Sequence, residues 1–384
     1  MRKDCRRHSP PTLHPPHLLH LHLLLVLFLC FSNLINKAEG GKEHRASNKT
    51  TISSLLVFGD STVDPGNNNF IGTIFRSDFP PYGKDFKDQI PTGRFSNGRL
   101  GTDFLASFVG IKEYIPPYLD PTLSTEDLLS GVSFASAGSG FDPLTPTISN
   151  VLDIPSQLEY FKEYKRRVES AIGKGRMENH INNALFLISA GTNDFVINYF
   201  TLPIRPKTFT ISAYQQFVMQ NLKDLIQGLR DEGAQRMVVI GLPPMGCLPI
   251  VITLNAVETH NKQRKCIEKY SSVARDFNAM LQTELNSMQM KLAHLGFKIY
   301  YVDAYNALTN IIQSHSQLGF DEVSDGCCGT GYLEASFLCN PKSYLCPDTS
   351  RYVFFDSIHP TEKAYYNVFK AGIPTYTKII QEFN

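Results

Sequence analysis

Short apolar runs alternate with helix-periodic stretches along most of this 384-residue chain, and this alternation is the feature that most limits its fold. Strands that alternate with helices over such a length pair in parallel, and the helices cover both faces of the sheet. The sequence therefore predicts an α/β protein. The strands are expected at 55–59, 132–135, 184–189, 236–240, 298–302 and 352–355, and the helices at 156–172, 211–230, 257–295 and 361–381.

One domain is expected over residues 51–384. Beyond Thr50 no change of composition, low-complexity linker or internal repeat divides the chain. The hydrophobic content of 42% supports a substantial core. Two long connections, 65–97 and 321–350, are rich in Pro, Gly and Asn. Such connections are typical of loops that shape a binding site rather than of minimal turns.

The first forty residues have a different character from the rest. A basic lead precedes the apolar run 18–31, and small residues follow near position 40. About 20 apolar residues are needed to span a bilayer, whereas this run has 14 and contains His20 and His22. We therefore expect residues 1–40 to be a cleaved secretory signal and residues 41–50 to be an exposed segment. A membrane anchor is the alternative interpretation.

The mature chain is expected to be nearly neutral. Loss of the leader removes five Lys or Arg and two Asp or Glu, which leaves 32 positive and 34 negative residues and a formal net charge of −2. This balance predicts no nucleic-acid partner and no anionic-membrane partner. The chain contains one N-x-S/T acceptor, Asn48, just after the leader, and we expect it to be glycosylated.

Six cysteines remain after the leader, an even number that predicts three disulfides in an oxidising compartment, with 15 possible connectivities. A zinc site is a weak alternative, because no C-x-x-C pair is present. The six are Cys247, Cys266, Cys327, Cys328, Cys339 and Cys346.

Polar segments follow four of the expected strands. Parallel α/β sheets bind ligands beyond the carboxyl ends of their strands, so these segments are expected to meet at one site. The segments are Asp60-Ser61, SAGSG at 136–140, AGTND at 190–194 and DSIHPTE at 356–362.

Ser61 is the candidate nucleophile. A serine hydroxyl becomes reactive when a histidine, oriented by a carboxylate, takes its proton. Among the histidines beyond the leader, only His359 has an acid three residues upstream at the end of an expected strand. Asp356 is placed to accept a hydrogen bond from the ring nitrogen that faces away from Ser61. The alternative is an ordinary turn in which Asp356 caps the next helix.

The oxyanion of such a reaction needs donors that are held in place beforehand. The backbone N–H groups of Ser61 and Gly138 and the side-chain amide of Asn193 are the candidates. Each has an ordinary alternative, because glycine permits a tight turn and asparagine often caps a helix. The sequence lacks the motifs of several other catalytic and nucleotide-binding sites. These absent motifs are G-x-S-x-G, H-E-x-x-H, the P-loop and G-x-G-x-x-G.

Four segments together resemble the sequence blocks of the plant GDSL esterase/lipase family, within the SGNH hydrolase superfamily, over about residues 51–380. Two departures occur in the second block, where Ser133 stands in place of a frequent Asn and Ala137 in place of a frequent Gly. The first block reads G-D-S-T rather than G-D-S-L. The segments are VFGDSTVDPGNNN at 57–69, GVSFASAGSG at 131–140, SAGTNDF at 189–195 and FFDSIHPTE at 354–362.

The resemblance implies a flavodoxin-like SGNH hydrolase fold, a three-layer sandwich around a parallel sheet. It implies a Ser61–Asp356–His359 triad, an oxyanion hole of Ser61, Gly138 and Asn193, and no metal or cofactor. The implied activity is cleavage of carboxylic esters, including lipid esters, through an acyl-enzyme, in the apoplast or cell wall and without stable membrane insertion. An acyltransferase, a catalytically silent cell-wall binding protein and a metal phosphodiesterase remain alternatives, and the oligomeric state stays open.

Overall fold

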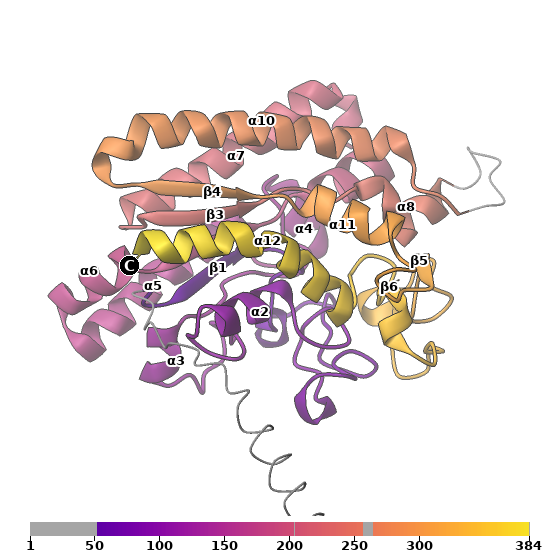
Figure 1. Ribbon diagram of the computed structural model, residues 1–384, viewed down its shortest axis with the longest axis horizontal. Coiled ribbons are helices and arrows are strands. Elements are labelled where there is room, and N and C mark those ends of the chain that lie inside the picture. Colours follow the sequence, from indigo (N-terminus) through magenta and orange to yellow (C-terminus); the bar gives the residue numbers. More distant parts are fainter. Residues whose placement is uncertain (1–51, 203, 256–263, 384) are drawn as a thin grey trace, which may run out of the picture. The chain divides into compact units, whose positions relative to one another are not determined.

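The computed structural model describes residues 52–202, 204–255 and 264–383. The described residues form one compact unit built around a four-stranded parallel sheet in the order β1-β2-β3-β4. Both faces of this sheet are covered, which explains why its strands are nearly continuous apolar runs. The strands are β1 (Leu55–Gly59), β2 (Leu185–Ser189), β3 (Arg236–Ile240) and β4 (Lys298–Val302) (Figure 1).

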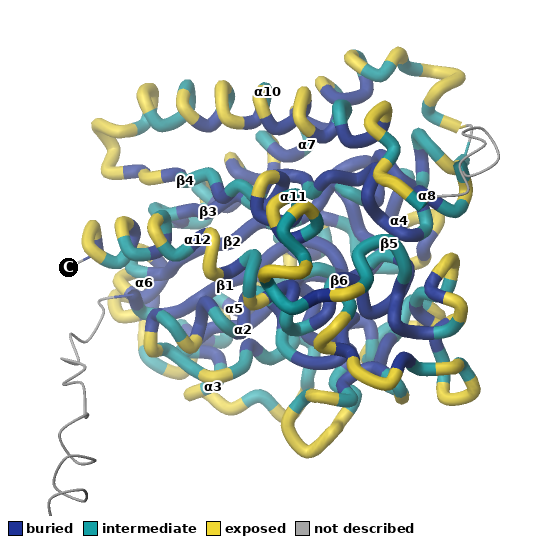
Figure 2. Tube along the Cα trace, turned by 45° about the vertical axis from the view of Figure 1, so that its right-hand side comes forward, coloured by how far each residue is buried: buried dark blue, intermediate teal, exposed yellow. Residues whose placement is uncertain are grey.

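Helices cover both faces of the sheet, so the three-layer α/β expectation is confirmed. Side chains alternate between the faces of a strand, and the sheet accordingly contributes to two apolar clusters. Helices α5 (Ile154–Ile172), α7 (Ile211–Asp231) and α10 (Glu268–Leu292) pack on one face. Helices α2 (Gly101–Phe108) and α12 (Glu362–Phe383) pack on the other. Figure 2 shows buried strands between helices whose outer turns are exposed.

The remaining elements lie mostly in the connections. The shorter helices are α3 (Thr125–Ser130), α4 (Leu144–Ser149), α6 (Lys174–Asn182), α8 (Pro249–Leu254) and α11 (Ala304–Gln313), and a π-helical segment spans Asp194–Thr201. The 3-10 segments are Asn67–Phe70, Lys87–Gln89, Arg205–Lys207, Met245–Cys247, Ala293–Leu295, Ser336–Leu338 and Thr349–Arg351.

Two of the expected strands differ from the prediction. The segment 132–135 forms no regular strand. Its Ser133 forms two isolated bridges, one with Val57 on β1 and one with Pro117. The strand expected at 352–355 is β6 (Tyr352–Phe354), and it pairs with β5 (Glu322–Gly326) in a separate two-stranded sheet. The expected strand is therefore present, but it lies outside the main sheet.

The helix expected at 257–295 begins later than predicted. Its described part, α10, starts at Glu268, and residues 264–267 before it are not helical, while 257–263 lie outside the described residues. Cys266 is bonded to Cys247, and the backbone N–H of Ile267 donates to the carbonyl of Gly246 at 2.8 Å. This tie to a distant turn prevents the helix from extending toward its amino end.

The three expected disulfides are present, and they join Cys247 to Cys266, Cys327 to Cys346 and Cys328 to Cys339. The adjacent cysteines 327 and 328 therefore bond to different partners, and both bonds close the long connection 321–350. This connection leads directly into β6. The disulfides thus hold the loop that approaches the strand before Asp356.

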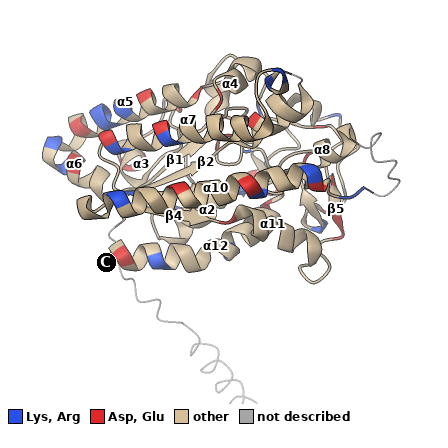
Figure 3. Cartoon of the chain, turned by 90° about the horizontal axis from the view of Figure 1, so that it is seen from above, with Lys and Arg blue, Asp and Glu red and all other residues tan. Residues whose placement is uncertain are grey.

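Several expectations fall outside the described residues. These are the secretory signal at 1–40, the exposed segment at 41–50 and glycosylation at Asn48. Within the described ranges, no helix combines the length and the apolar character needed to cross a membrane. Charges of both signs are interspersed on the outer faces of α5, α6, α7 and α10 (Figure 3).

Candidate active site

The turn after β1 places Ser61 at the carboxyl edge of the sheet. Gly59 has a φ of +144°, and a Cβ at this position would lie 1.9 Å from the carbonyl oxygen of Ser189 on β2. Only glycine allows this close approach. The next backbone N–H, that of Asp60, donates to the same Ser189 oxygen at 3.0 Å. The end of β1 is thus clamped to β2 just before Ser61.

Asp60 holds the turn beneath Ser61. Its Oδ1 accepts hydrogen bonds from the backbone N–H of Thr62 at 2.9 Å and from Thr62 Oγ1 at 2.7 Å. Burial raises the pKa of Asp60 from 3.8 to about 6, against the opposing effect of the Thr62 hydrogen bonds and the charge of His359. A side-chain carboxylate that accepts from the N–H two residues on is a common way to fix a turn.

The raised pKa of Asp60 predicts that stability falls as pH rises. Between pH 3.8 and about 6 the folded protein keeps a proton on this carboxyl that the unfolded chain has released, so unfolding becomes easier as pH increases. The wild type should lose about 3 kcal/mol of unfolding free energy from this group by pH 7. Urea unfolding at pH 4 and pH 7 measures the change.

Asp60→Asn is the matched variant for this measurement. Both Thr62 hydrogen bonds end on Oδ1, so an amide oxygen at that position accepts both of them while the titrating group is lost. The variant should show a smaller stability difference between pH 4 and pH 7 than the wild type. An unchanged difference would contradict the assignment.

Ser61, His359 and Asp356 form a continuous hydrogen-bonded chain. Ser61 Oγ lies 2.8 Å from His359 Nε2, and His359 Nδ1 lies 2.9 Å and 2.7 Å from the two oxygens of Asp356. The serine and the histidine are 298 residues apart in sequence. All three side chains are buried. The loop after β6 therefore carries the histidine and its acid to the end of β1.

His359 Nδ1 is not the only donor to Asp356. The backbone N–H groups of Ile358 and His359 donate to Oδ1 at 2.8 Å and 2.7 Å, and the hydroxyl of Tyr82 donates to Oδ2 at 2.7 Å. These donors hold the carboxylate plane against the imidazole.

Tyr82 is a site residue that sequence reasoning missed. It lies in the long connection 65–97, where its aromatic ring is one of several and nothing in the sequence links it to Asp356. Its side chain is 1% exposed and packs edge-on against Phe95 and Phe355. Its oxygen accepts from the backbone N–H of Ser336 at 2.8 Å. Burial and then the charge of Asp356 raise the pKa of Tyr82 well above its usual value, so it remains a donor.

Asn193 lies beside the segment that carries Gly138. Its Nδ2 donates to the carbonyl of Ser139 at 2.9 Å, which leaves the second amide hydrogen for another acceptor. Gly138 has a φ of +85°, a conformation that favours glycine. Within the part of the chain that the structure describes, the backbone N–H groups of Ser61 and Gly138 donate to no acceptor. These N–H groups are therefore free to bind a substrate oxygen.

The acids near the strand ends accept from the backbone. Asp64 accepts from the N–H groups of Gly66, Asn67 and Ala137. Asp194 accepts from Phe141 N and Asp142 N at 2.8 Å and 3.1 Å, and so it ties the segment after Gly138 to the segment after Asn193. Among the described residues, no group of three or more His, Cys, Asp or Glu is arranged to hold a metal ion.

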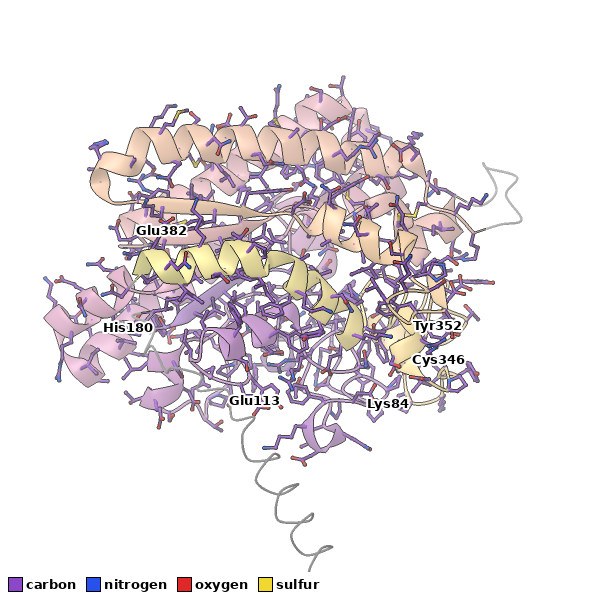
Figure 4. All side chains as sticks on the ribbon, viewed as in Figure 1. Lys84, Glu113, His180, Cys346, Tyr352 and Glu382 are labelled. Carbon is purple, nitrogen blue, oxygen red and sulfur yellow. A yellow bond between two sulfur atoms is a disulfide. The ribbon has the colours of Figure 1, made fainter. Side chains whose placement is uncertain are left out.

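A second buried histidine lies far from this site. His180 Nε2 is 2.9 Å from the hydroxyl of Tyr164, and burial lowers the pKa of His180 to about 4. Figure 4 shows His180 at the opposite end of the molecule from Tyr352, the first residue of β6. This histidine packs in the core and does not contact the Ser61 site.

The sequence model of the family described as GDSL-like Lipase/Acylhydrolase matches residues 55–371. This match spans the sheet and all of the candidate site residues. The chain belongs to this family. Membership places it among the plant esterases and lipases that hydrolyse carboxylic esters, and the observed parallel α/β fold agrees with the SGNH hydrolase architecture.

Three relatives from Arabidopsis thaliana illustrate the similarity of this GDSL-family chain. GDSL esterase/lipase At5g45960 is 63% identical over 87% of this chain and 89% of its own length. GDSL esterase/lipase At1g06990 is 42% identical over 83% of this chain and 87% of its own length. GDSL esterase/lipase At2g31540 is 44% identical over 83% of this chain and 88% of its own length. The similarity thus extends over nearly the whole relative in each case.

Proposed function

We propose that this chain is a secreted serine hydrolase that cleaves carboxylic esters through an acyl-enzyme, with Ser61 as nucleophile. The observation that carries the proposal is the hydrogen-bonded chain from Ser61 Oγ through His359 to Asp356. A serine hydroxyl, an imidazole and a carboxylate in this order form the arrangement that activates a serine for attack.

His359 acts as the general base in the first half of the reaction. With its Nδ1 hydrogen donated to Asp356, its Nε2 accepts the proton of Ser61 as Oγ attacks the ester carbonyl. The carboxylate keeps the imidazole in this tautomer and stabilises the imidazolium that forms. His359 then returns the proton to the leaving alcohol as the tetrahedral intermediate collapses to the acyl-enzyme.

The backbone N–H groups of Ser61 and Gly138 and the amide of Asn193 bind the oxyanion. Such donors lower the barrier because their hydrogen bonds strengthen as charge develops on the oxygen. In the second half of the reaction His359 removes a proton from water, which attacks the acyl-enzyme and releases the carboxylic acid. The cycle uses no group beyond those of the chain and a water molecule.

Secretion is supported by the amino-terminal sequence and by the cysteines. A basic lead followed by a short apolar run is typical of a secretory signal, and three disulfides are typical of an oxidising compartment. We place the mature enzyme outside the cell, in the apoplast or cell wall, with a small-molecule or lipid ester as its partner.

Asn193→Ala should lower turnover with little change in KM. Loss of one oxyanion donor reduces kcat by about 10²–10³, because the interaction is made mainly in the transition state. Steady-state kinetics on a soluble nitrophenyl ester measure the effect, and thermal unfolding checks that the variant is folded. A folded variant with wild-type turnover would remove Asn193 from the oxyanion hole.

Product analysis tests the function as a whole. The enzyme collected from the medium of a secreting host should convert an ester into equal amounts of acid and alcohol, and a chelator should not change the rate. An acceptor alcohol that diverts most of the acyl group into a new ester would instead indicate an acyltransferase. Release of no acid from any ester would overturn the proposal.

A further inference from the structure

The loop 328–339, which a disulfide between its end residues closes, lies directly against Asp356. On one side of Asp356, the backbone N–H of Cys328 donates to the carbonyl of the preceding residue at 2.9 Å. On the other side, the N–H of the following residue donates to the carbonyl of Glu334 at 2.8 Å. Figure 1 shows the chain between β5 and β6 folded beside these two strands. The loop therefore holds the main chain of the acid on both sides.

Ser336, in the same loop, reaches the carboxylate of Asp356 through Tyr82. The backbone N–H of Ser336 donates to the Tyr82 hydroxyl oxygen at 2.8 Å, and that hydroxyl donates to Asp356 Oδ2 at 2.7 Å. A phenol has one hydrogen to donate, and an N–H bound to its oxygen leaves that hydrogen directed toward the carboxylate. In a buried chain of hydrogen bonds each donor also polarises the next. The position of Ser336 thus affects how well Tyr82 donates to the acid.

An uncommon backbone conformation at Ser336 holds this N–H in place. Its φ is +52°, in the left-handed region that few residues other than glycine adopt. The residue is buried, and its hydroxyl accepts from the N–H of Arg76 at 3.1 Å and donates to the carbonyl of Arg76 at 3.0 Å. Such a conformation persists where the surrounding contacts fix it, and it is concentrated at functional sites. The hydroxyl therefore fixes the direction of the N–H that Tyr82 accepts.

The loop 328–339 has internal contacts that leave it few other conformations. The carboxylate of Glu334 accepts from the N–H groups of Thr330, Tyr332 and Leu333 at 2.9, 3.1 and 3.2 Å, respectively. The two cysteines at the ends of the loop are buried, and a covalent bond between loop ends removes most of the open conformations. The loop thus offers the acid a rigid support.

We propose that the loop 328–339 is a positioning element of the triad, in which Ser336 directs the Tyr82 hydroxyl to Asp356. The inference rests on the proposed function, because it takes Asp356 as the acid that orients the catalytic histidine. Ser336 acts through Tyr82, so it is a positioning residue rather than a catalytic one. Its contribution to turnover should accordingly disappear when the Tyr82 hydroxyl is absent.

Ser336→Ala tests this role. The methyl group loses both hydrogen bonds to Arg76, so the left-handed conformation is no longer fixed and the N–H turns away from Tyr82. On a nitrophenyl ester, kcat per site titrated with a fluorophosphonate should fall by about three- to tenfold. KM should stay within about twofold, since the acid acts in the chemical step. Titration counts only competent sites, so a partly unfolded sample does not imitate the effect. An unchanged kcat would overturn the proposal.

The decisive comparison is Ser336→Ala in the Tyr82→Phe background. Residues in contact that act as one unit have non-additive effects. Because Tyr82→Phe already removes the hydroxyl through which Ser336 acts, the second substitution should change kcat by less than about 1.5-fold. An equal loss in both backgrounds would mean that Ser336 supports the fold without acting through Tyr82, and this result would also overturn the proposal.

Ser343→Ala is the matched control. The hydroxyl of Ser343 also binds two backbone groups, since it accepts from the N–H of Asn340 at 3.1 Å and donates to the carbonyl of Leu338 at 3.2 Å. Neither of these bonds leads to Tyr82, so kcat and KM should equal those of the wild type. A loss as large as that of Ser336→Ala would indicate a general loosening of the connection 321–350 and would contradict a specific role of Ser336.

Ser336→Gly covers the case in which Ser336→Ala does not fold. Glycine adopts a φ of +52° without steric cost, but without the hydroxyl it is not held there. We expect the same loss of kcat in the wild-type background and the same absence of loss with Tyr82→Phe. The proposed function is judged separately on the wild type. If the wild type hydrolyses the ester and both Ser336 variants turn over normally, only this inference fails. A folded wild type that shows neither hydrolysis nor fluorophosphonate labelling would reject both.

Discussion

Ser61→Ala is expected to lower kcat on a nitrophenyl ester by a factor on the order of 10⁴–10⁶ and to abolish labelling by a fluorophosphonate. The methyl group has no oxygen to attack the carbonyl or the phosphorus, and the remaining groups bind the ester without forming an acyl-enzyme. The fold should be preserved, because among the described residues the hydroxyl of Ser61 forms a hydrogen bond only with His359.

The measurement combines steady-state kinetics with intact mass after labelling. Wild type should gain the mass of one adduct, and Ser61→Ala should gain none. Ser53→Ala is the matched control, since Ser53 Oγ donates to the carbonyl of His180 at the far end of the molecule. A labelled Ser61→Ala variant would mean that another residue is the nucleophile. A folded wild type that takes no label would favour a binding protein over an enzyme.

Asp356→Asn should lower kcat by about 10⁴ while leaving the fold intact. The Oδ1 of Asp356 accepts from two backbone N–H groups, so the amide oxygen of Asn would take that position. The amide nitrogen would then face His359 Nδ1 and the hydroxyl of Tyr82, both of which donate to Asp356. A donor in this place favours the other imidazole tautomer, in which Nε2 carries the hydrogen and cannot accept the proton of Ser61.

Tyr82→Phe provides a graded comparison with Asp356→Asn. It removes one of the donors to Asp356 and leaves the ring packed among Phe95 and Phe355. We expect turnover to fall by about tenfold, in line with the loss of one hydrogen bond to a charged group. Turnover on a nitrophenyl ester measures the loss of activity, and thermal unfolding checks that the fold is preserved. If Asp356→Asn retained more activity than Tyr82→Phe, Asp356 would not be the acid that orients His359.

Much of the architecture could be predicted from local patterns. The four strands of the main sheet were located to within one residue, because each is a short apolar run between turn residues. The candidate site was predicted from position and from the family blocks, since Ser61 and Asn193 follow such strands and parallel strands share their carboxyl edge. The strand at 352–355 was also predicted, but its place outside the main sheet was not, and segment 132–135 forms no regular strand. A short apolar run does not show which segment will lie beside it, and strand pairing depends on that neighbour.

The sequence by itself determined the parallel α/β class, the family blocks and the residue types from which a site can be built, because these depend on periodicity and on neighbours along the chain. Only the tertiary structure decided how distant residues meet. It joined Ser61 to His359 across 298 positions, brought Tyr82 to Asp356 and selected one of the possible cysteine pairings. It also placed α12 against one face of the sheet. Such contacts arise from side-chain packing between elements that are remote in sequence, and no local pattern specifies them.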